Sequence, residues 1–469
     1  MAVTGPGREL EARRALAEKC RSCGTCRSVC PIFAEVGDEC SVARGKVALV
    51  RAVLDGQLEL SEIFDERLQR CLNCKACVDA CPNEVRVDDL VLAARSGLVE
   101  AGRLPFLKRF VFRQVLRRGG ILPPFTRLAS FVQRALLRGL PRDSAFRLLL
   151  PLAGIDRDRV LPEFADRTFL ETMPGVVPAA GPLPAAPLVE TPRTGAARRA
   201  KRVGYFVGCA TNLIYTETGR VIVETLAASG VDVVIPKRQV CCGTPVFNAG
   251  DFETARELAR KNIELFRDLD VDAVITGCAS GGLAFKREYE ELLGFEGGFP
   301  HPVFDFTEFL ACRGLPKGLR RDDAAGPAGP GADGSRLRVT YHDPCHLNRG
   351  QGVSEEPRAV LRALPGVEFV EMADADRCCG GGGTFCLTEY DLAKAIAEPK
   401  MDAIRAADVD VVATECPVCI MQLRDMVEQA GLEVEVLGVA DVVAMGFSGT
   451  DPAVVSGAGS QATRTGGSR

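Results

Sequence analysis

Apolar residues follow two different periods in the two parts of this 469-residue chain. In the first hundred residues they recur every three or four positions, which predicts amphipathic helices. After residue 203, short β-branched runs alternate with longer helical patterns, which predicts strands joined by helices and therefore parallel sheets. The helical positions include Val42, Leu49, Val53 and Leu54, then Phe64 and Leu68; predicted strands span 231–235, 271–275 and 409–412, and a predicted helix spans 252–269.

The α/β part of the chain contains two copies of one unit. Each copy has a cysteine after its first strand, a Cys-Cys-Gly turn and a cysteine after a later strand, and the second copy follows the first by 136 to 138 residues. Such a constant offset indicates duplication, with the copies packed about a pseudo-twofold axis. Because ligands of parallel sheets lie at the carboxyl ends of strands, we expect the cysteines to gather at one sheet edge. The matched anchors are Cys209 with Cys345, Cys241-Cys242-Gly243 with Cys378-Cys379-Gly380, and Cys278 with Cys416.

Two cysteine runs of the form CxxCxxCxxxCP lie near the start of the chain, with about forty residues between them. This spacing is typical of a pair of 4Fe-4S clusters, in which three cysteines of each run hold one cluster and the fourth completes the other. Structural zinc is the alternative, but a zinc ribbon needs two cysteine pairs rather than two quartets. We therefore expect an electron-carrying domain. Its predicted ligands are Cys20, Cys23, Cys26 and Cys81 for one cluster, and Cys71, Cys74, Cys77 and Cys30 for the other.

The two copies of the α/β unit differ in their cysteines. The second copy has five and ends in Cys-Pro-Val-Cys, whereas the first has four and reads Cys-Ala-Ser-Gly at that place, so Gly281 occupies its last ligand position. Zinc or redox-inert thiols are the alternative for the second copy. The second set is Cys345, Cys378, Cys379, Cys416 and Cys419, the first is Cys209, Cys241, Cys242 and Cys278, and Cys40, Cys312 and Cys386 are left as ordinary thiols.

These residues resemble the cysteine-rich CCG domain, Cx(n)CCGx(m)CxxC, of heterodisulfide reductase subunits and of the iron-sulfur subunits of glycolate oxidase and D-lactate dehydrogenase. The order of a helical two-cluster ferredoxin and two CCG copies is similar to that of the D subunit of heterodisulfide reductase and of the iron-sulfur subunit of glycolate oxidase. The resemblance covers about residues 15–100 and 203–445. It implies a noncubane 4Fe-4S cluster on the five cysteines of the second copy, and zinc, a different cluster or nothing on the four of the first.

Three soft segments divide the chain by their Pro, Ala, Gly and Ser content. We predict an α+β multidomain fold, in which an α-helical ferredoxin domain with two clusters precedes a duplicated α/β CCG domain. The predicted divisions are the ferredoxin domain 1–100, a basic helical connector 101–173, a Pro/Ala linker 174–202, the degenerate first repeat 203–321, a linker 322–336, the complete second repeat 337–447 and a disordered tail 448–469.

Two of the three histidines flank a predicted ligand, Cys345. Because an imidazole beside a redox site can supply a proton or a hydrogen bond to cluster sulfur, His342 and His346 are candidate proton donors, with structural capping as the alternative. Residues 380–383 are all glycine, which permits close backbone approach to a cluster. No GxGxxG fingerprint lies in a strand-to-helix turn, so we expect no flavin of the chain's own.

Residues 101–150 contain eleven Lys or Arg and one acid, Asp143, with apolar residues between them. Such a stretch favours contact with a quinone-bearing anionic membrane surface or an acidic partner; a helical layer packed on its own domain is the alternative. The net charge of −4 and the lack of a stacking platform argue against nucleic acid. No apolar run forms a signal peptide or reaches membrane-spanning length, so we expect a cytoplasmic protein, peripheral at the inner face of the membrane.

The motifs predict an iron-sulfur electron-transfer subunit of an oxidoreductase. The resemblance implies an FAD-binding partner that oxidises a 2-hydroxy acid, glycolate or D-lactate, and a quinone or other carrier as acceptor. The alternative is heterodisulfide or disulfide reduction at the C-terminal CCG cluster, with a proton from His342 or His346. A noncatalytic zinc scaffold is a third class.

Overall fold

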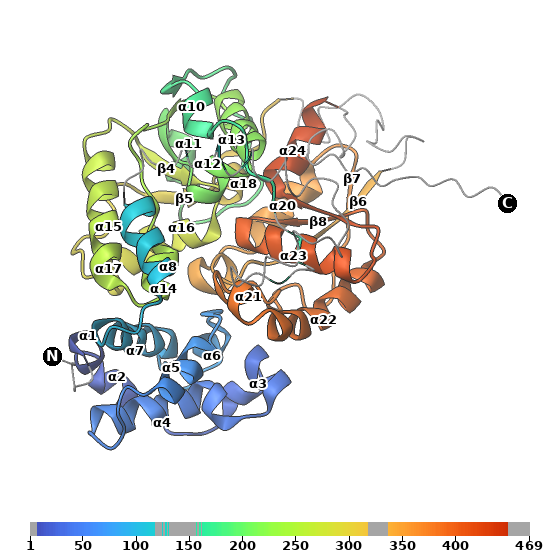
Figure 1. Ribbon diagram of the computed structural model, residues 1–469. Coiled ribbons are helices and arrows are strands. Elements are labelled where there is room, and N and C mark those ends of the chain that lie inside the picture. The colour runs from blue at the N-terminus through green and yellow to red at the C-terminus, as the bar shows by residue number, and fades with distance from the viewer. Residues whose placement is uncertain are drawn as a thin grey trace.

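Three units make up the protein in this computed structural model, a helical N-terminal domain and two α/β units that lie side by side above it (Figure 1). Residues 7–117, 162–317 and 336–448 are described, together with 124, 127–128, 130, 156 and 159–160. Residues 322–335 of the expected linker 322–336, the tail after Ser448 and most of the basic stretch lie outside the described residues.

The N-terminal domain is helical, as the apolar spacing predicts. Val47 and Val50 of α4 pack against Phe64 and Leu68 of α5 in one buried core, which α7 completes. The Ser61 side chain accepts a hydrogen bond from the Phe64 amide (3.2 Å) and so caps α5. The helices are α1 (Arg8–Glu11), α2 (Arg14–Glu18), α3 (Pro31–Val36), α4 (Ala43–Leu54), α5 (Glu62–Gln69), α6 (Ala76–Asp79) and α7 (Val87–Glu100), with short turns η1 (Thr25–Arg27) and η2 (Glu39–Ser41).

Each α/β unit is built on a sheet whose strands follow the same order. The first sheet runs β1-β3-β2-β4-β5 and the second β7-β6-β8-β9, so that β3-β2-β4-β5 corresponds to β7-β6-β8-β9, all parallel. This equivalence confirms the duplication expected from the sequence. The strands are β1 (Val176–Val177), β2 (Arg202–Phe206), β3 (Asp232–Val234), β4 (Ala273–Thr276), β5 (Val303–Asp305), β6 (Leu337–Tyr341), β7 (Val367–Phe369), β8 (Val411–Thr414) and β9 (Glu435–Gly438).

Helices cover both faces of the sheets and join the two units. Helix α13 of the first repeat packs on α24 of the second, and α18 of the first packs on α20 of the second. Since α13 and α20 follow the first strand of each repeat, and α18 and α24 the last, the two contacts are related by the expected pseudo-twofold axis. The helices are α12 (Cys209–Leu213), α13 (Thr216–Ala228), α14 (Thr244–Asn248), α15 (Phe252–Arg267), α16 (Ala279–Leu283), η6 (Ala284–Glu288), α17 (Tyr289–Glu291), α18 (Phe306–Arg313), α19 (Asn348–Gln351), α20 (Glu355–Ala363), α21 (Phe385–Thr388), α22 (Tyr390–Ala407), α23 (Pro417–Gln429) and α24 (Val439–Ser448).

The segment 174–202 differs from the linker expected of it. Strand β1 pairs antiparallel with β3, with Val176 opposite Val234, and so extends the first sheet at its edge. Helix α11 (Thr194–Arg199) packs on α18, and the buried Arg313 side chain donates a hydrogen bond to the Ala197 carbonyl (2.7 Å). The sequence predicted a linker because the segment is rich in Pro and Ala; its pairing with β3 and packing on α18 depend on residues distant in sequence. A further short helix, α10 (Phe169–Thr172), precedes it.

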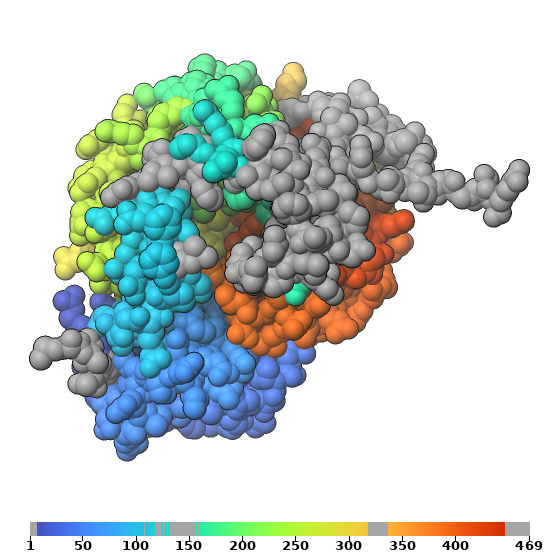
Figure 2. Space-filling model, viewed as in Figure 1, coloured from blue at the N-terminus to red at the C-terminus, as the bar shows by residue number. Residues whose placement is uncertain are grey.

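The described start of the basic connector packs on the first repeat. It forms α8 (Phe106–Phe110) and the π-helix η3 (Val111–Leu116), which Figure 2 shows in cyan along the surface above the N-terminal domain. Phe112 is buried in the core of the first repeat, and Arg113 pairs with Asp251 (2.9 Å). This part therefore fits the packed-layer alternative. Within the described ranges, no helix is both long and apolar enough to cross a membrane.

Candidate functional site

Eight cysteines of the N-terminal domain line two neighbouring cavities. One cavity lies beside η1, and the other lies between α3, α4, α6 and the start of α7. The fourth cysteine of each run crosses to the cavity of the other run, which is the grouping that the spacing predicts. The first cavity is lined by Cys20, Cys23, Cys26 and Cys81, the second by Cys30, Cys71 and Cys74, and Cys77 lines both.

The donor set at both cavities is sulfur alone, which suits iron-sulfur clusters. None of the twenty cysteines forms a disulfide. Burial raises the pKa of Cys74 to about 11 and also raises the pKa of Cys30, so these thiolates need a positive partner to persist. Iron ions would supply it, and the residues present therefore fit two clusters. That each group binds one stays a prediction.

The five cysteines of the second repeat converge at the carboxyl ends of its strands. Cys345 follows β6, Cys378 and Cys379 follow β7, and Cys416 and Cys419 lie at the N-terminus of α23 after β8. Hydrogen bonds from Cys378 and Cys419 hold the pKa of Cys379 well below its usual value, and a hydrogen bond from Cys419 lowers the pKa of Cys416. Hydrogen bonding to Cys379 raises the pKa of Cys378 and of Cys419, and burial raises the pKa of Cys345, so only Cys379 and Cys416 favour the thiolate form without bound iron.

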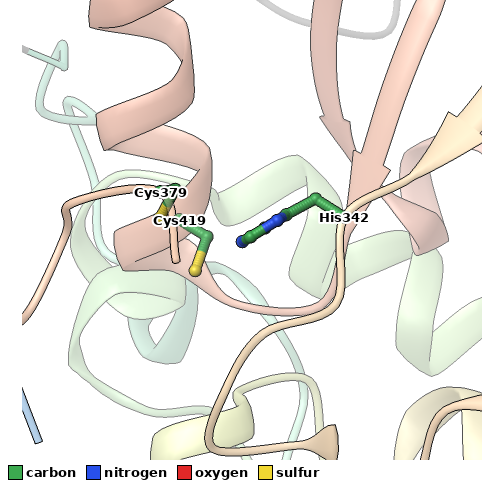
Figure 3. Close-up of side chains that lie close together, drawn as sticks. All are labelled: His342, Cys379 and Cys419. Atoms are coloured by element: carbon green, nitrogen blue, oxygen red, sulfur yellow. The ribbon is translucent and has the colours of Figure 1, made fainter. Parts of the chain in front are cut away.

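His342 lies directly against these thiols. One ring nitrogen of His342 and the sulfurs of Cys379 and Cys419 all lie within 4.8 Å of one another, with the ring pointing from the end of β6 toward the start of α23 (Figure 3). The ring hydrogen-bonds to Cys379, while Nδ1 has no partner among the described residues. His342 therefore lies against the predicted cluster site.

His346, the other candidate proton donor, has a different environment. Its Nε2 lies 3.1 Å from the Asn73 carbonyl oxygen of the N-terminal domain, and its Nδ1 lies 3.0 Å from Ser280 Oγ of the first repeat. Burial lowers the pKa of His346 to about 4, so the ring is neutral near pH 7. This residue joins all three units, which agrees with the structural alternative for it.

The first repeat brings together its four predicted cysteines, but the residues that surround them differ from those of the second repeat. Cys241 accepts a hydrogen bond from the Gly243 amide (3.5 Å), and Cys242 shares one with Thr244 Oγ1 (3.3 Å). Phe206 stands where the second repeat has His342, and a Cβ added to Gly281 would lie 3.8 Å from the Phe206 ring. The space for a fifth thiol is thus bordered by a fully buried phenylalanine. The other two cysteines, Cys209 and Cys278, follow β2 and β4.

The sequence did not single out two buried cations near the second repeat's thiols. Lys400 of α22 is fully buried, and the thiol of Cys379 is the nearby group that most raises its pKa. Arg159, which follows the basic stretch, is 4% exposed and donates to Cys386 Sγ (3.3 Å) and Gln422 Oε1 (3.3 Å). Cys386, expected to be ordinary, therefore has a charged neighbour. Only an alignment of the two repeats, which places Lys400 opposite Asn262, could have singled out Lys400 from the sequence.

The second cavity of the N-terminal domain adjoins the second repeat. Cys74 packs on the same small apolar cluster as Cys378, and the charge of Cys74 is the largest after burial among the influences that raise the pKa of Cys345. Arg349 lies beside all three thiols, which raise its pKa against the effect of burial. The two thiol groups are therefore direct neighbours.

The glycine run 380–383 accounts for part of this close approach. Gly380 has φ 80°, and a Cβ there would lie 2.3 Å from the Ala393 carbonyl oxygen of α22. A Cβ on Gly382 would lie 2.5 Å from the Leu72 side chain, next to Cys71. A side chain at 382 would separate the second repeat from the N-terminal domain, whereas one at 380 would push the Cys-Cys-Gly turn away from α22 within the repeat.

Comparison with known protein families agrees with this division of the chain. Residues 16–85 match the 4Fe-4S dicluster domain, and residues 203–286 and 339–424 each match the cysteine-rich domain CCG. The two CCG matches coincide with the two repeats of the structure. They therefore include both sets of strand-end cysteines.

Several known proteins match almost the whole chain. A probable glycolate oxidase iron-sulfur subunit of Bacillus subtilis is 30% identical over 432 residues, which cover 90% of this chain and 91% of that protein. The glycolate oxidase iron-sulfur subunit of Escherichia coli is 27% identical, with 87% and 89% covered. The D subunit of the dihydromethanophenazine:CoB–CoM heterodisulfide reductase of Methanosarcina mazei is 26% identical, with 91% and 93% covered. The chain therefore belongs to the family of iron-sulfur oxidoreductase subunits that join a 4Fe-4S dicluster domain to two cysteine-rich CCG domains.

Proposed function

We propose that this chain transfers electrons from a flavoprotein partner that oxidises a 2-hydroxy acid, such as glycolate or D-lactate, to a quinone or another carrier. Oxidation of the hydroxyl to a carbonyl releases two electrons and two protons, and clusters bound at the thiol groups would supply one-electron carriers for them. The similarity to glycolate oxidase iron-sulfur subunits over most of the chain supports this assignment.

One observation carries the proposal: Cys74 of the N-terminal domain and Cys378 of the second repeat pack on the same apolar cluster. Metal binding that only stabilised the N-terminal domain would not require its ligands to lie next to a second set of thiols, whereas electron transfer between two clusters does require short distances. Here Leu72 and Gly382 bring the two thiol groups together, and Arg349 lies beside both. The first cavity, where Cys23 is exposed, adjoins the second through Cys77, and the second adjoins Cys378 of the second repeat.

Each set of residues has a proposed occupant. Two 4Fe-4S clusters would be held by the eight cysteines of the N-terminal domain, in the two groups that the residue spacing predicts. A noncubane 4Fe-4S cluster would be held by the five cysteines of the second repeat, with His342 in contact. The first repeat, with Phe206 and Gly281 in place of the histidine and the fifth thiol, would not hold the same cluster; zinc remains an alternative there.

The partner surfaces are also proposals. Cys23, at the first cavity, is exposed, which favours electron delivery there from an FAD-binding subunit. Phe106 is 80% and Phe110 51% exposed on α8, beside Arg109. Exposed aromatic and basic side chains together suit contact with an anionic membrane surface that carries the quinone. Binding of the full chain to vesicles with anionic lipid, weakened in Phe106→Ala/Phe110→Ala, would support this contact, and equal binding by both proteins would contradict it.

Anaerobic purification with iron and sulfide analysis tests the assignment. About twelve irons per chain are expected, against about eight if only the N-terminal domain binds clusters. Co-purification with a flavoprotein, and reduction of the chain by that partner with glycolate or D-lactate, would support the proposed donor. Zinc without iron would overturn the electron-transfer function.

Disulfide or heterodisulfide reduction is the second candidate, because a specific observation favours it. Cys379 has a strongly lowered pKa and lies beside His342, so a thiolate and a proton source meet at one place. Reduction would consume two electrons and two protons and release two thiols from one disulfide. Thiol release from a disulfide by the iron-loaded chain, lost in Cys379→Ser, would favour this function, whereas no release from any disulfide would leave the 2-hydroxy acid pathway.

A further inference from the structure

The two repeats place different residues at one buried position behind their cysteine pairs. Lys400 of α22 corresponds to Asn262 of α15, 138 residues earlier, which is the offset that also relates Cys416 to Cys278. Both side chains are fully buried. One repeat thus has a neutral amide where the other has an ammonium group.

Both side chains tie their helix to the loop that carries the cysteine pair. The Asn262 amide donates hydrogen bonds to the carbonyls of Val240 (3.3 Å) and Cys241 (3.1 Å). The Lys400 ammonium donates to the carbonyls of Asp374 and Ala375, the latter at 3.1 Å. Because a neutral amide suffices for this anchoring in the first repeat, anchoring does not explain a charge in the second.

A buried ammonium group costs free energy unless negative charge compensates it. Two acids near Lys400 already have arginine partners, since Asp343 pairs with Arg358 (2.6 Å) and Asp376 with Arg349 (2.6 Å). Burial lowers the pKa of Lys400 to about 8, and the thiolate of Cys379 opposes this more than any other neighbour. Lys400 Nζ also lies 4.0 Å from Met372 Sδ, and Met372 packs in the same buried cluster as Cys379, so the compensating charge is that of the thiol site.

We propose that the positive charge of Lys400 raises the reduction potential of the cluster held by the five cysteines of the second repeat. The proposal rests on the proposed function, because it needs a cluster at that site. A fixed positive charge in a low-dielectric interior stabilises the reduced form, which carries one more negative charge, over the oxidised form. Electrons would then collect at the second repeat. The polar side chains that hydrogen-bond around the first repeat's cysteine pair, Thr244, Asn262 and Tyr289, are neutral.

The test is a redox titration of the full, iron-loaded chain followed by electron paramagnetic resonance. Lys400→Gln keeps hydrogen-bond donors but removes the charge. We expect it to retain about twelve irons and to lower the equilibrium constant for reduction of the second-repeat cluster about tenfold, which is 59 mV for one electron. The signals of the two N-terminal clusters should titrate as in the wild type. Lys400→Arg, which restores the charge, should bring the potential back toward the wild-type value.

A second variant covers the case in which Lys400→Gln fails to fold. Lys400→Met fills the same buried space without a charge, and the potential of its second-repeat cluster should fall as it does in Lys400→Gln. Twelve irons with an unmoved potential in either variant would overturn the role of Lys400 alone. Eight irons in the wild-type chain would contradict the third cluster, and with it both this inference and the proposed function of the second repeat.

Discussion

The two repeats share a fold and an offset, yet they surround their cysteines with different chemistry. Repeat two has His342, Cys419 and Lys400 where repeat one has Phe206, Gly281 and Asn262. The strands, the Cys-Cys-Gly turn and the helix after it are common to both. The comparison shows that the same arrangement of cysteines at a sheet edge can stand beside ionisable side chains in one repeat and beside neutral ones in the other.

The replacements in repeat one fit one another. Phe206 packs edge-on against Phe285 with ring centroids 4.5 Å apart and also contacts Phe266 at 6.1 Å. An aromatic cluster thus extends to the position of the missing histidine and borders the space that a fifth ligand would occupy. Because the two repeats differ at all three positions, no single substitution would turn repeat one into a copy of repeat two.

Removal of one thiol from each repeat should separate them most strongly. Cys379→Ala is expected to lower the iron content from about twelve to about eight per chain and to reduce turnover with the flavoprotein partner to background. The matched variant Cys242→Ala should keep both. Iron and sulfide analysis of the anaerobically purified variants measures this, and equal iron loss in the two would show that both repeats hold clusters.

Loss of the aromatic filling should weaken repeat one. Phe206→Ala removes a fully buried ring and is expected to lower the free energy of unfolding by about 3–5 kcal/mol, through lost burial and the cavity left behind. Thermal unfolding followed by circular dichroism measures the change. Phe106→Ala is the control, because that ring is 80% exposed and its loss should leave the midpoint nearly unchanged. Equal midpoints for Phe206→Ala and wild type would argue against the filling role.

Exchange of His342 for its counterpart should affect repeat two less than loss of a ligand does. His342→Phe removes the hydrogen bond to Cys379 and should weaken cluster retention about tenfold to a hundredfold, as loss of groups that orient ligands commonly does. The rate of iron loss to a chelator, compared among wild type, His342→Phe and the repeat-one control His301→Phe, gives the readout. Unchanged retention in His342→Phe would assign the histidine to proton supply alone.

The smallest effect is expected where repeat one meets the N-terminal domain, at Glu288. Burial raises the pKa of this carboxyl to about 7, while Lys75, 3.5 Å away, opposes the shift. The folded state therefore holds a proton that the unfolded state loses near pH 4.5, so stability falls as pH rises from about 4.5 to 7. Glu288→Gln should remove this loss.

The expected gain of Glu288→Gln over wild type is on the order of 1 kcal/mol at pH 7.5 and close to zero at pH 4, where the carboxyl is protonated in both the folded and the unfolded state. Unfolding midpoints at the two pH values measure it. Glu290→Gln, an exposed neighbour, is the control and should show no such dependence. A gain equal at both pH values would contradict the titration of Glu288. The corresponding residue of repeat two is Met426, so only one repeat carries this acid.

Local patterns predicted much of the fold and of the site. Residue spacing predicted that the fourth cysteine of each run would lie at the other run's cavity, and the predicted β-branched runs lie within two residues of β3, β4 and β8. These features depend on neighbours in sequence. By contrast, Lys400 and Arg159 look like surface cations in the sequence, because only tertiary packing buries them. The edge strand β1 was missed for a similar reason, since two valines between prolines carry no period.

The bridge formed by His346 has a consequence for how fast the protein can work. Its ring contacts Asn73 below and Ser280 beside it, so the N-terminal domain, the first repeat and the second repeat are held by one side chain. Carriers in this arrangement would not depend on a swinging domain to meet, and the distance between them would stay constant through each turnover. Electron flow inside the chain should therefore be insensitive to solvent viscosity, and only the encounter with outside partners should slow as the solution thickens.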